Sequence, residues 1–306
     1  RKALMEGKWK TKGFHEFDLM ERGKLRHIRS VHISERVVQR CLCDNVLVPV
    51  FSAAFIYDNA ASLKDKGIDF AMDRMNCHLQ RHVRKHGLKG GILVYDFSDY
   101  FNSAPHGPIY RENERRITDG RVRAVANGLM EDFGPVGFGL GSQVSQIDAL
   151  MLPNGLDHFI KEELRIRGAG RYMDDGYLIH EDVAYLKTCQ EAVLTKCREL
   201  GIRMNRKKTR IVKLGEARFL KTKFLVTQTG RVIRKMHRKS ARKMREKLKK
   251  FRRWVDEGTM TREDVRTAYE SWRGHMRRGN SWKVLRRMDK YYRKLYGSGD
   301  WRDNHV

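Results

Sequence analysis

Two adjacent carboxylates, Asp174 and Asp175, lie between two short apolar runs in the segment Gly170-Arg-Tyr-Met-Asp-Asp-Gly-Tyr-Leu-Ile-His180. This pattern predicts a strand, a tight turn and a second strand, with the acidic residues at the turn. Because strand side chains alternate between faces, the two carboxylates cannot both enter an apolar core. A solvated hairpin turn, where Asp is common, is one explanation. A site for divalent metal ions is the other, since Mg²⁺ prefers carboxylate and phosphate oxygens.

A second apolar segment, Gly91-Ile-Leu-Val-Tyr-Asp96, also ends in an acidic residue. We expect it to form a strand with Asp96 at its end. A carboxylate from a second strand is what a two-metal site for phosphoryl transfer requires, because two ions clamp the attacking and leaving oxygens. Asp99 follows where the chain leaves this strand, and we interpret it as a turn or cap residue.

Taken in chain order, the motifs resemble those of the reverse transcriptases over nearly the whole sequence. The matching segments are residues 36–39, 57–67, 96–101, 140–146, 172–175, 201–209 and 219–224. The resemblance implies an RNA-directed DNA polymerase with an α+β, right-hand fold. Its fingers would be residues 1–90, its antiparallel-sheet palm residues 91–230 and its basic three-helix thumb residues 231–306.

The resemblance also implies roles for single residues. Asp96, Asp174 and Asp175 would hold two Mg²⁺ ions, with Mn²⁺ as a substitute, and Asp175 is usually the less essential of the hairpin pair. Lys208, or the adjacent Lys207, would donate a proton to the leaving pyrophosphate. The aromatic gate that excludes a ribose 2′-OH would be Phe101. The other candidate nucleotide-binding residues are Phe97, Leu140, Gly141, Gln146, Arg26, Arg29, Arg36 and Lys64, of which the last four also suit template phosphate. The candidate primer-grip residues are Phe219, Leu220 and Phe224.

One motif departs from the common pattern of the family. Most relatives carry Gln where this chain has Leu140, and Pro where it has Gln146. The form found here resembles the enzymes of diversity-generating retroelements, which copy template adenines unfaithfully. Gln donates and accepts hydrogen bonds, whereas Leu offers only an apolar surface. Loss of a hydrogen bond that senses geometry would reduce the free-energy difference between right and wrong nucleotides. Alternatively, Leu140 belongs to the core beside Phe138.

The composition agrees with a nucleic-acid enzyme. Lys and Arg number 64 against 37 Asp and Glu, for a formal net charge of +27 and a pI near 10.1. Such a chain attracts polyanions, and its binding to them weakens steeply with salt. Residues 231–296 alone carry 24 Lys and Arg against 7 Asp and Glu. A basic run can be a solvated face or a disordered tail, but this one has regular apolar periodicity.

Apolar residues recur at steps of three and four through the basic segment, which predicts three amphipathic helices. The three stripes are Ala241, Met244, Leu248, Phe251 and Val255; Val265, Ala268, Tyr269 and Trp272; and Trp282, Leu285, Met288, Tyr291 and Leu295. Thr261 and Asp264 resemble a capping box, and Gly297 suits a helix end. We expect the stripes to form a core. The candidate nucleic-acid-binding residues on the basic faces are Arg242, Arg245, Lys249, Arg252 and Arg253.

Elsewhere, helical and extended patterns alternate. We predict helices near residues 35–50, 67–86, 114–130, 144–166 and 182–200, and strands near residues 26–33, 209–214 and 218–227. Because the central strands form a hairpin, the sheet should be antiparallel, with helices on one face.

Five cysteines without paired spacing are typical of free thiols in a reducing cytosol. Cys41 and Cys43, with His32 nearby, are too closely spaced for a structural zinc site, and we expect them at a boundary between a helix and the core. No apolar run approaches membrane-spanning length, and no secretory signal pattern is present. We therefore expect a cytoplasmic protein of a bacterial or phage-infected cell.

The implied partners are template RNA, a DNA or RNA primer and dNTPs, with a non-coding RNA and a small basic accessory protein as further candidates. Two other functions stay open. One is a non-polymerising RNA-binding protein with a degenerate palm, against which the intact carboxylates argue. The other is an antiviral defence-associated or retron-type reverse transcriptase, which would copy a dedicated non-coding RNA or use no template.

Overall fold

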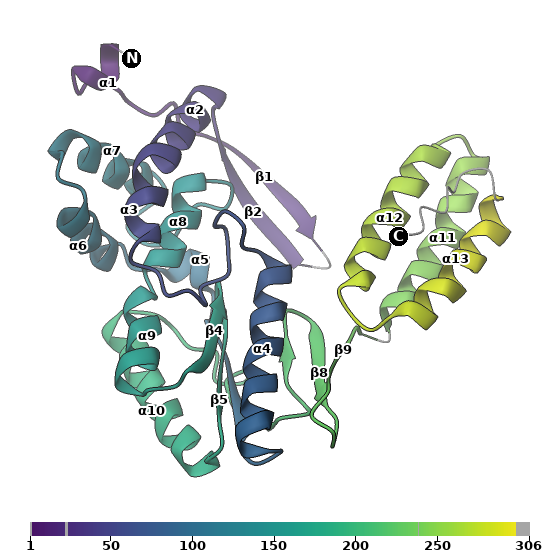
Figure 1. Cartoon of the computed structure of the whole chain (residues 1–306). Coiled ribbons are helices and arrows are strands. Elements are labelled where there is room, and N and C mark those ends of the chain that lie inside the picture. The colour runs from purple at the N-terminus through teal and green to yellow at the C-terminus, as the bar shows by residue number, and fades with distance from the viewer. Residues whose placement is uncertain (1, 22–23, 238, 298–306) are drawn as a thin grey trace. The chain divides into compact units, whose positions relative to one another are not determined.

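The computed structural model describes residues 2–21, 24–237 and 239–297 (Figure 1). The chain divides into two compact units, Arg1–Lys213 and Leu214–Val306. Among the described residues, no helix combines the length and the apolar character needed to cross a membrane.

The first unit contains a four-stranded antiparallel sheet. Its strands are β3 (Gly91–Asp96), β4 (Gly168–Tyr172), β5 (Asp175–His180) and β6 (Arg210–Lys213), in the order β4-β5-β3-β6. β4 and β5 are the two arms of the hairpin that the acidic motif predicts. Both central strands are almost fully buried, as their apolar sequences require.

Helices cover both faces of this sheet, whereas the sequence pattern predicted helices on one face only. Leu178 packs with residues of α10 (Val183–Glu199) in the main core, whereas its neighbour Tyr177 contacts His78 of α4 (Ile68–His86). Because adjacent strand residues face opposite ways, α4 and α10 lie on opposite faces. The prediction was wrong because α4 carries three His and many charged residues, which obscure in the sequence its narrow buried stripe of Ala71, Met72, Met75 and Leu79.

Two predicted helices are interrupted. The segment near 114–130 forms α6 (Gly107–Arg116) and α7 (Gly120–Glu131), because the Asp119 side chain accepts hydrogen bonds from the backbone of Arg121 and Val122 and starts a new helix. The segment near 144–166 forms α8 (Gln143–Met151), α9 (Asn154–His158) and the π-helix η2 (Phe159–Glu163). Pro153 lies at the break, where its missing N–H cannot continue the helix.

The N-terminal segment begins with the short helix α1 (Lys2–Met5) and an antiparallel hairpin of β1 (Phe14–Glu21) and β2 (Lys24–Val31). Only the second of these strands was predicted. The helix expected near 35–50 consists of α2 (Ile33–Leu42), the π-helix η1 (Cys43–Leu47) and α3 (Val48–Ser52). Cys41 is exposed and Cys43 is buried, which confirms the expected boundary, and all five cysteines are free.

The second unit combines a three-stranded antiparallel sheet with three helices. The strands are β7 (Arg218–Phe219), β8 (Thr222–Val226) and β9 (Val232–Lys235), and the helices are α11 (Lys239–Asp256), α12 (Arg262–Arg277) and α13 (Trp282–Tyr296). The predicted stripes meet in one core, whose buried members are Met244, Leu248, Val265, Tyr269, Met288, Tyr292 and Tyr296.

α12 and α13 begin differently. The capping box of Thr261 and Asp264 is present with both of its hydrogen bonds. Trp282, by contrast, is 67% exposed, so its assignment to the third stripe was wrong. It begins α13, and the buried stripe runs instead through Leu285, Met288, Tyr292 and Tyr296.

Candidate active site

The acidic residues of the two motifs come together at one end of the central strands. In the β3–β5 register Asp96 lies directly opposite Asp175. Asp174 lies at the hairpin turn, where its carbonyl accepts a hydrogen bond from the backbone N–H of Phe97 at 3.1 Å. Asp96 is only 5% exposed. Asp174 and Asp175, at the turn itself, are half-buried.

Two side chains from the segment after α10 contact Asp96. Lys208 Nζ donates to both of its carboxylate oxygens, at 2.8 and 2.7 Å, and Asn205 Nδ2 donates at 3.0 Å. The amino group of Lys208 is thus held against the first carboxylate. Although burial opposes it, this contact with Asp96 raises the pKa of Lys208, so the side chain keeps its proton at neutral pH.

The three carboxylates repel one another. Burial, followed by the charges of Asp174 and Asp96, raises the pKa of Asp175 to about 7. Burial also raises the pKa of Asp174, and the charge of Asp96 adds to this effect. Concentrated negative charge of this kind is what a cation would stabilise.

The chemistry of these donors suits Mg²⁺, which is bound through carboxylates and substrate phosphates. Within the described part of the chain, however, no group of three or more His, Cys, Asp or Glu side chains is arranged to hold a metal ion. Asp96 instead contacts the ammonium group of Lys208. The chemistry of the three carboxylates therefore fits a divalent ion, and Lys208 contacts one of them, Asp96.

Sequence reasoning missed a buried arginine that supports the hairpin turn. Arg171 in β4 is fully buried and donates to both carboxylate oxygens of Asp157, at 2.7–3.0 Å. Its Nη1 also donates to the carbonyl of Met173 at 2.9 Å. Met173 has φ +52°, a left-handed conformation that costs a non-glycine residue free energy. Arg171 thus holds the turn that carries Asp174; the only signal in the sequence is a charged residue inside a buried strand.

The motif at residues 57–67 adds to the edge of the same strand. The backbone N–H of Arg171 donates to the carbonyl of Asp58 at 3.1 Å, and that of Ala60 donates to the carbonyl of Arg171 at 3.0 Å. Asn59 pairs with Arg171 in a parallel bridge. Residues 58–60 are therefore a further hydrogen-bonding partner of β4 at the edge of the sheet.

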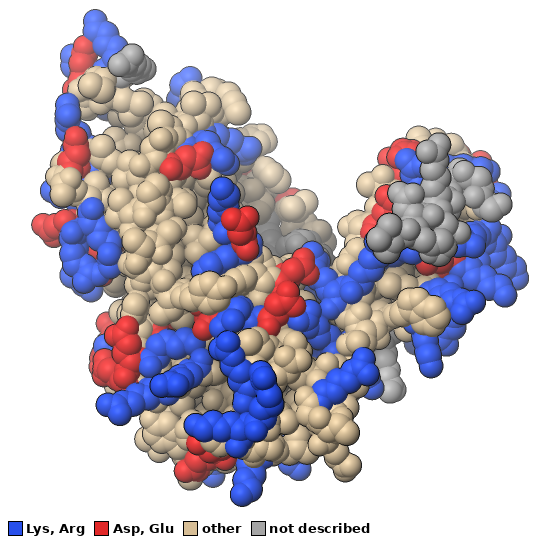
Figure 2. All heavy atoms as spheres, in the orientation of Figure 1, with Lys and Arg blue, Asp and Glu red and all other residues tan. Residues whose placement is uncertain are grey.

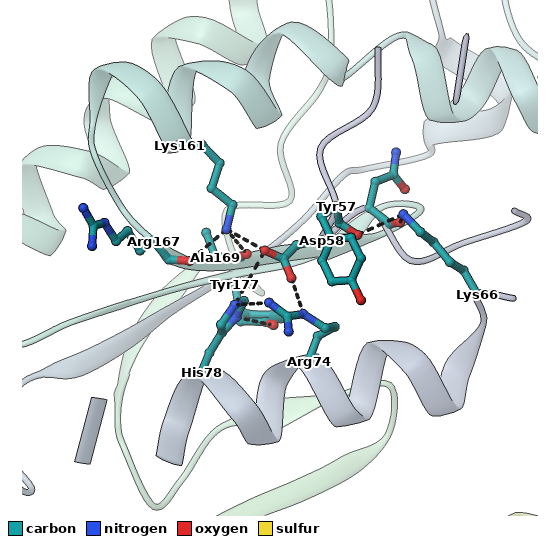
Figure 3. Close-up of polar contacts among 10 residues, drawn as sticks. Tyr57, Asp58, Lys66, Arg74, His78, Lys161, Arg167, Ala169 and Tyr177 are labelled. Carbon is teal, nitrogen blue, oxygen red and sulfur yellow. Dashed lines mark hydrogen bonds and ion pairs between the residues drawn. The ribbon is translucent and has the colours of Figure 1, made fainter. Parts of the chain in front are cut away.

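A network around the Asp58 carboxylate ties this motif to both α4 and η2 (Figure 3). Asp58 accepts hydrogen bonds from Arg74 Nε at 2.6 Å and from Lys161 Nζ at 2.8 Å. His78 lies beside this pair, and its Nδ1 hydrogen-bonds the Tyr177 hydroxyl at 3.0 Å. Burial lowers the pKa of His78 to about 4, so the ring is neutral at physiological pH. We call these residues the Asp58 cluster.

The aromatic candidates lie in a cluster next to Asp96. The Phe97 ring is buried, and its centroid is 5.1 Å from that of Tyr100. Phe101 is half-buried and packs edge-to-face against Tyr100 and Phe138. Asp99 has φ +48° and directly precedes the short helix α5 (Tyr100–Ser103), which confirms its interpretation as a turn and cap residue.

The motif at residues 140–146 lies across the start of α8. Phe138 is buried, whereas Leu140 is half-buried. Gly141 has φ +107°, a conformation that favours glycine, and Gln146 is exposed on an otherwise buried helix. Gln39 accepts hydrogen bonds from Ser142 Oγ and from the Gln143 N–H, which joins the motif at residues 36–39 to this one.

The basic candidates of the N-terminal segment differ in their surroundings. Arg29 donates to Glu16 and to the carbonyl of Phe133, both at 2.9 Å. Its guanidinium also lies 4.2 Å from the centroid of the Phe14 ring. Arg36 donates to Ser30, and Lys64 is exposed. The side chain of Arg26 lies outside the part of the chain that the structure describes.

The primer-grip candidates lie in β7, in β8 and in the turn between them. Phe219 and Phe224 are buried within the second unit. Leu220 lies at the turn, where it is half-buried and has φ +48°. On α11, three basic candidates form ion pairs four residues along the helix, namely Arg242 with Glu246, Arg252 with Asp256 and Arg253 with Glu257. Arg245 lies over the Tyr291 ring, and Lys249 is exposed.

An antiparallel sheet with helices on both faces and a hairpin of two acids opposite a third defines a polymerase fold of the α+β class. The model of the family described as "Reverse transcriptase (RNA-dependent DNA polymerase)" matches residues 12–225. The chain therefore belongs to the reverse transcriptase family. No curated protein matches it.

Solved telomerase structures share the fold. Telomerase from Candida tropicalis with the TWJ fragment of telomeric RNA aligns with a TM-score of 0.58 and 10% identity over 92% of this chain and 54% of that chain. Telomerase from Candida albicans with the same fragment aligns with a TM-score of 0.54 and 14% identity over 92% of this chain and 56% of that chain. Apo telomerase from Candida tropicalis, truncated from its C-terminal domain, aligns with a TM-score of 0.54 and 12% identity over 72% of this chain and 55% of that chain. The chain thus spans a little over half of these telomerase chains.

Proposed function

We propose that this protein is an RNA-directed DNA polymerase that extends a DNA or RNA primer on an RNA template by two-metal nucleotidyl transfer. The observation that carries the proposal is the placement of Asp96 directly opposite Asp175, with Asp174 at a turn held by Arg171. Membership of the reverse transcriptase family supports it. Fingers at residues 1–90, a palm at 91–230 and a thumb at 231–306 complete the proposed hand.

In this proposal Asp96, Asp174 and Asp175 hold two Mg²⁺ ions, or Mn²⁺ in their place. The ions would lower the pKa of the primer 3′-hydroxyl and neutralise the triphosphate. Lys208 enters the reaction with its proton bound and lies at the carboxylates, as a proton donor to pyrophosphate must. Phe101, which is half-buried and packs against Tyr100 and Phe138, would face the sugar of the incoming dNTP.

Primer extension on a defined RNA template with Mg²⁺ and dNTPs tests the proposal. We expect Asp96→Asn to reduce extension by about 10²–10³-fold, the loss that typically follows removal of one group that stabilises transition-state charge. Affinity for template–primer should change little. The exposed Glu163→Gln is the matched control and should leave extension unchanged. Substantial extension by the Asp96 variant would refute the assignment.

We further propose that copying is error-prone, as in a diversity-generating retroelement, with a non-coding RNA and a small basic accessory protein as candidate partners in the cytoplasm. Leu140 supports this, because it is half-buried rather than part of the core that contains Phe138. Leu140→Gln should restore a hydrogen-bonding side chain and lower the error frequency roughly tenfold at the affected template base, the scale of about 1.4 kcal/mol of added discrimination.

Sequencing every extension product from both enzymes measures that error frequency. Equal error spectra would remove the role of Leu140 and leave an accurate reverse transcriptase. Products unrelated to the template would instead favour a defence-associated enzyme that uses a dedicated RNA or none.

A further inference from the structure

A cationic pocket lies at the end of the sheet opposite the carboxylates. It has a volume of about 510 Å³ and is lined by three segments: one face of α4, residues 165–168 and the end of β5. In the β3–β5 register His180 pairs with Gly91, whereas the carboxylates pair at the other end. At about 3.3 Å per residue the two ends are roughly 17 Å apart. The Asp58 cluster contacts the strand between them through Tyr177.

The pocket is lined by more basic than acidic side chains. Arg81 and Lys85 are one turn apart on α4, and Arg165 and Arg167 lie on the facing segment; all four are exposed. Among the residues that the structure describes, none of these four side chains forms an ion pair. The one acid that lines the pocket, Glu181, lies 3.6–3.7 Å from the imidazoles of His86 and His180. Figure 2 shows Lys and Arg side chains gathered where the C-terminal half of α4 lies in Figure 1.

The other side chains of the pocket suit a nucleotide chain better than a metal ion. Within the described part of the chain, no cluster of His, Cys, Asp or Glu there could hold a metal. His86 and His180 are partly exposed. Imidazole and guanidinium planes are surfaces on which single-stranded RNA bases stack, and both groups donate hydrogen bonds to phosphate.

We propose that this pocket binds a single-stranded segment of RNA, at a site separate from the template–primer. Four cations on two segments exceed what one terminal phosphate requires, whereas a phosphodiester chain presents a phosphate at every nucleotide. The choice of RNA over DNA rests on the proposed function, because RNA is the polyanion on which such an enzyme would act.

The test measures binding of a fluorescent oligoribonucleotide to the full chain preloaded with excess unlabelled template–primer. The double variant Arg81→Gln/Lys85→Gln should bind on the order of tenfold more weakly at about 0.1 M salt. Its plot of log affinity against log salt should be shallower by about 1.4, the value for two lost phosphate contacts on a single strand.

The matched control is Arg84→Gln/Lys187→Gln, which removes the same charge from exposed positions outside the pocket. Equal losses in the two double variants, or no loss in either, would overturn the inference. Displacement of the RNA by millimolar inorganic phosphate or dNTP would also overturn it, in favour of a free-nucleotide site. Tighter binding of the same sequence as DNA would overturn the choice of RNA.

Primer extension by the same variants separates the two proposals. If the wild-type chain fails to extend a primer, the proposed function fails, while the difference between the double variants still decides the pocket. If it extends normally and the pocket variants bind RNA as the wild type does, only the pocket inference fails.

Discussion

At the scale of single residues, the chain keeps an acid where an apolar side chain would be expected. Asp148 on α8 is 2% exposed, and its Oδ1 has no hydrogen-bond partner among the described residues. Burial raises its pKa to about 8. Its charge also contributes, after burial itself, to the rise in the pKa of the Cys43 thiol to about 12. Asp148 is therefore largely protonated at neutral pH.

This burial gives a pH-dependent stability. An unfolded Asp loses its proton near pH 4, whereas folded Asp148 loses it near pH 8. Between these values the folded state binds more protons, so the free energy of unfolding falls as pH rises. Asp148→Asn cannot ionise, and it should unfold several degrees above the wild type at pH 8 while differing little at pH 5. Thermal unfolding monitored by circular dichroism from pH 5 to pH 8 measures this.

Glu163→Gln, at an exposed position, should follow the wild-type pH profile. If the Asp148→Asn profile also parallels the wild type, Asp148 does not remain protonated in the folded chain.

At the scale of elements, the catalytic hairpin depends on neighbours that no local pattern identifies. The sequence predicts β4, the turn and β5, because apolar alternation and two adjacent acids are local signals. It does not predict the bond from Arg171 to the Met173 carbonyl, nor the pairing of β4 with residues 58–60. The pairing with residues 58–60 joins segments that are distant in sequence. The bond to Met173 is local, but it depends on the burial of Arg171, whose ion pair with Asp157 replaces the hydration that a buried charge loses.

Arg171 is therefore a positioning residue for the turn. Arg171→Lys keeps the charge beside Asp157 but cannot also reach the Met173 carbonyl with a planar guanidinium fork. We expect kcat for primer extension to fall roughly tenfold or more, since small displacements of catalytic groups are costly, with little change in the KM for dNTP. Steady-state kinetics on a defined template provides the measurement.

A purely structural role would lower the melting temperature without lowering kcat, and that outcome would contradict the assignment. Arg115→Lys, exposed on α6, controls for the Arg-to-Lys exchange itself.

At the scale of the whole molecule, the sequence predicts the class of fold well and the placement of charges poorly. The strands of the sheet, the three helices after residue 238 and the carboxylate set follow from periodicity and motif order, and the structure confirms these strands and helices. The second covered face of the sheet, the exposed Trp282 and the cationic pocket of α4 were not predicted. Each depends on which face of a helix meets a distant strand, and helical spacing alone does not specify that partner.

The register of β3 with β5 also has a consequence for biosynthesis. Asp96 and Asp175 are about 80 residues apart in sequence, so a large loop must close before they can pair. At about 5–20 residues per second, a ribosome needs roughly 4–16 s to synthesise the chain between them. During that interval the nascent chain carries Asp96 without Asp175 or Lys208. The complete set of carboxylates is thus a late product of translation, and a chain that stops before the hairpin lacks it.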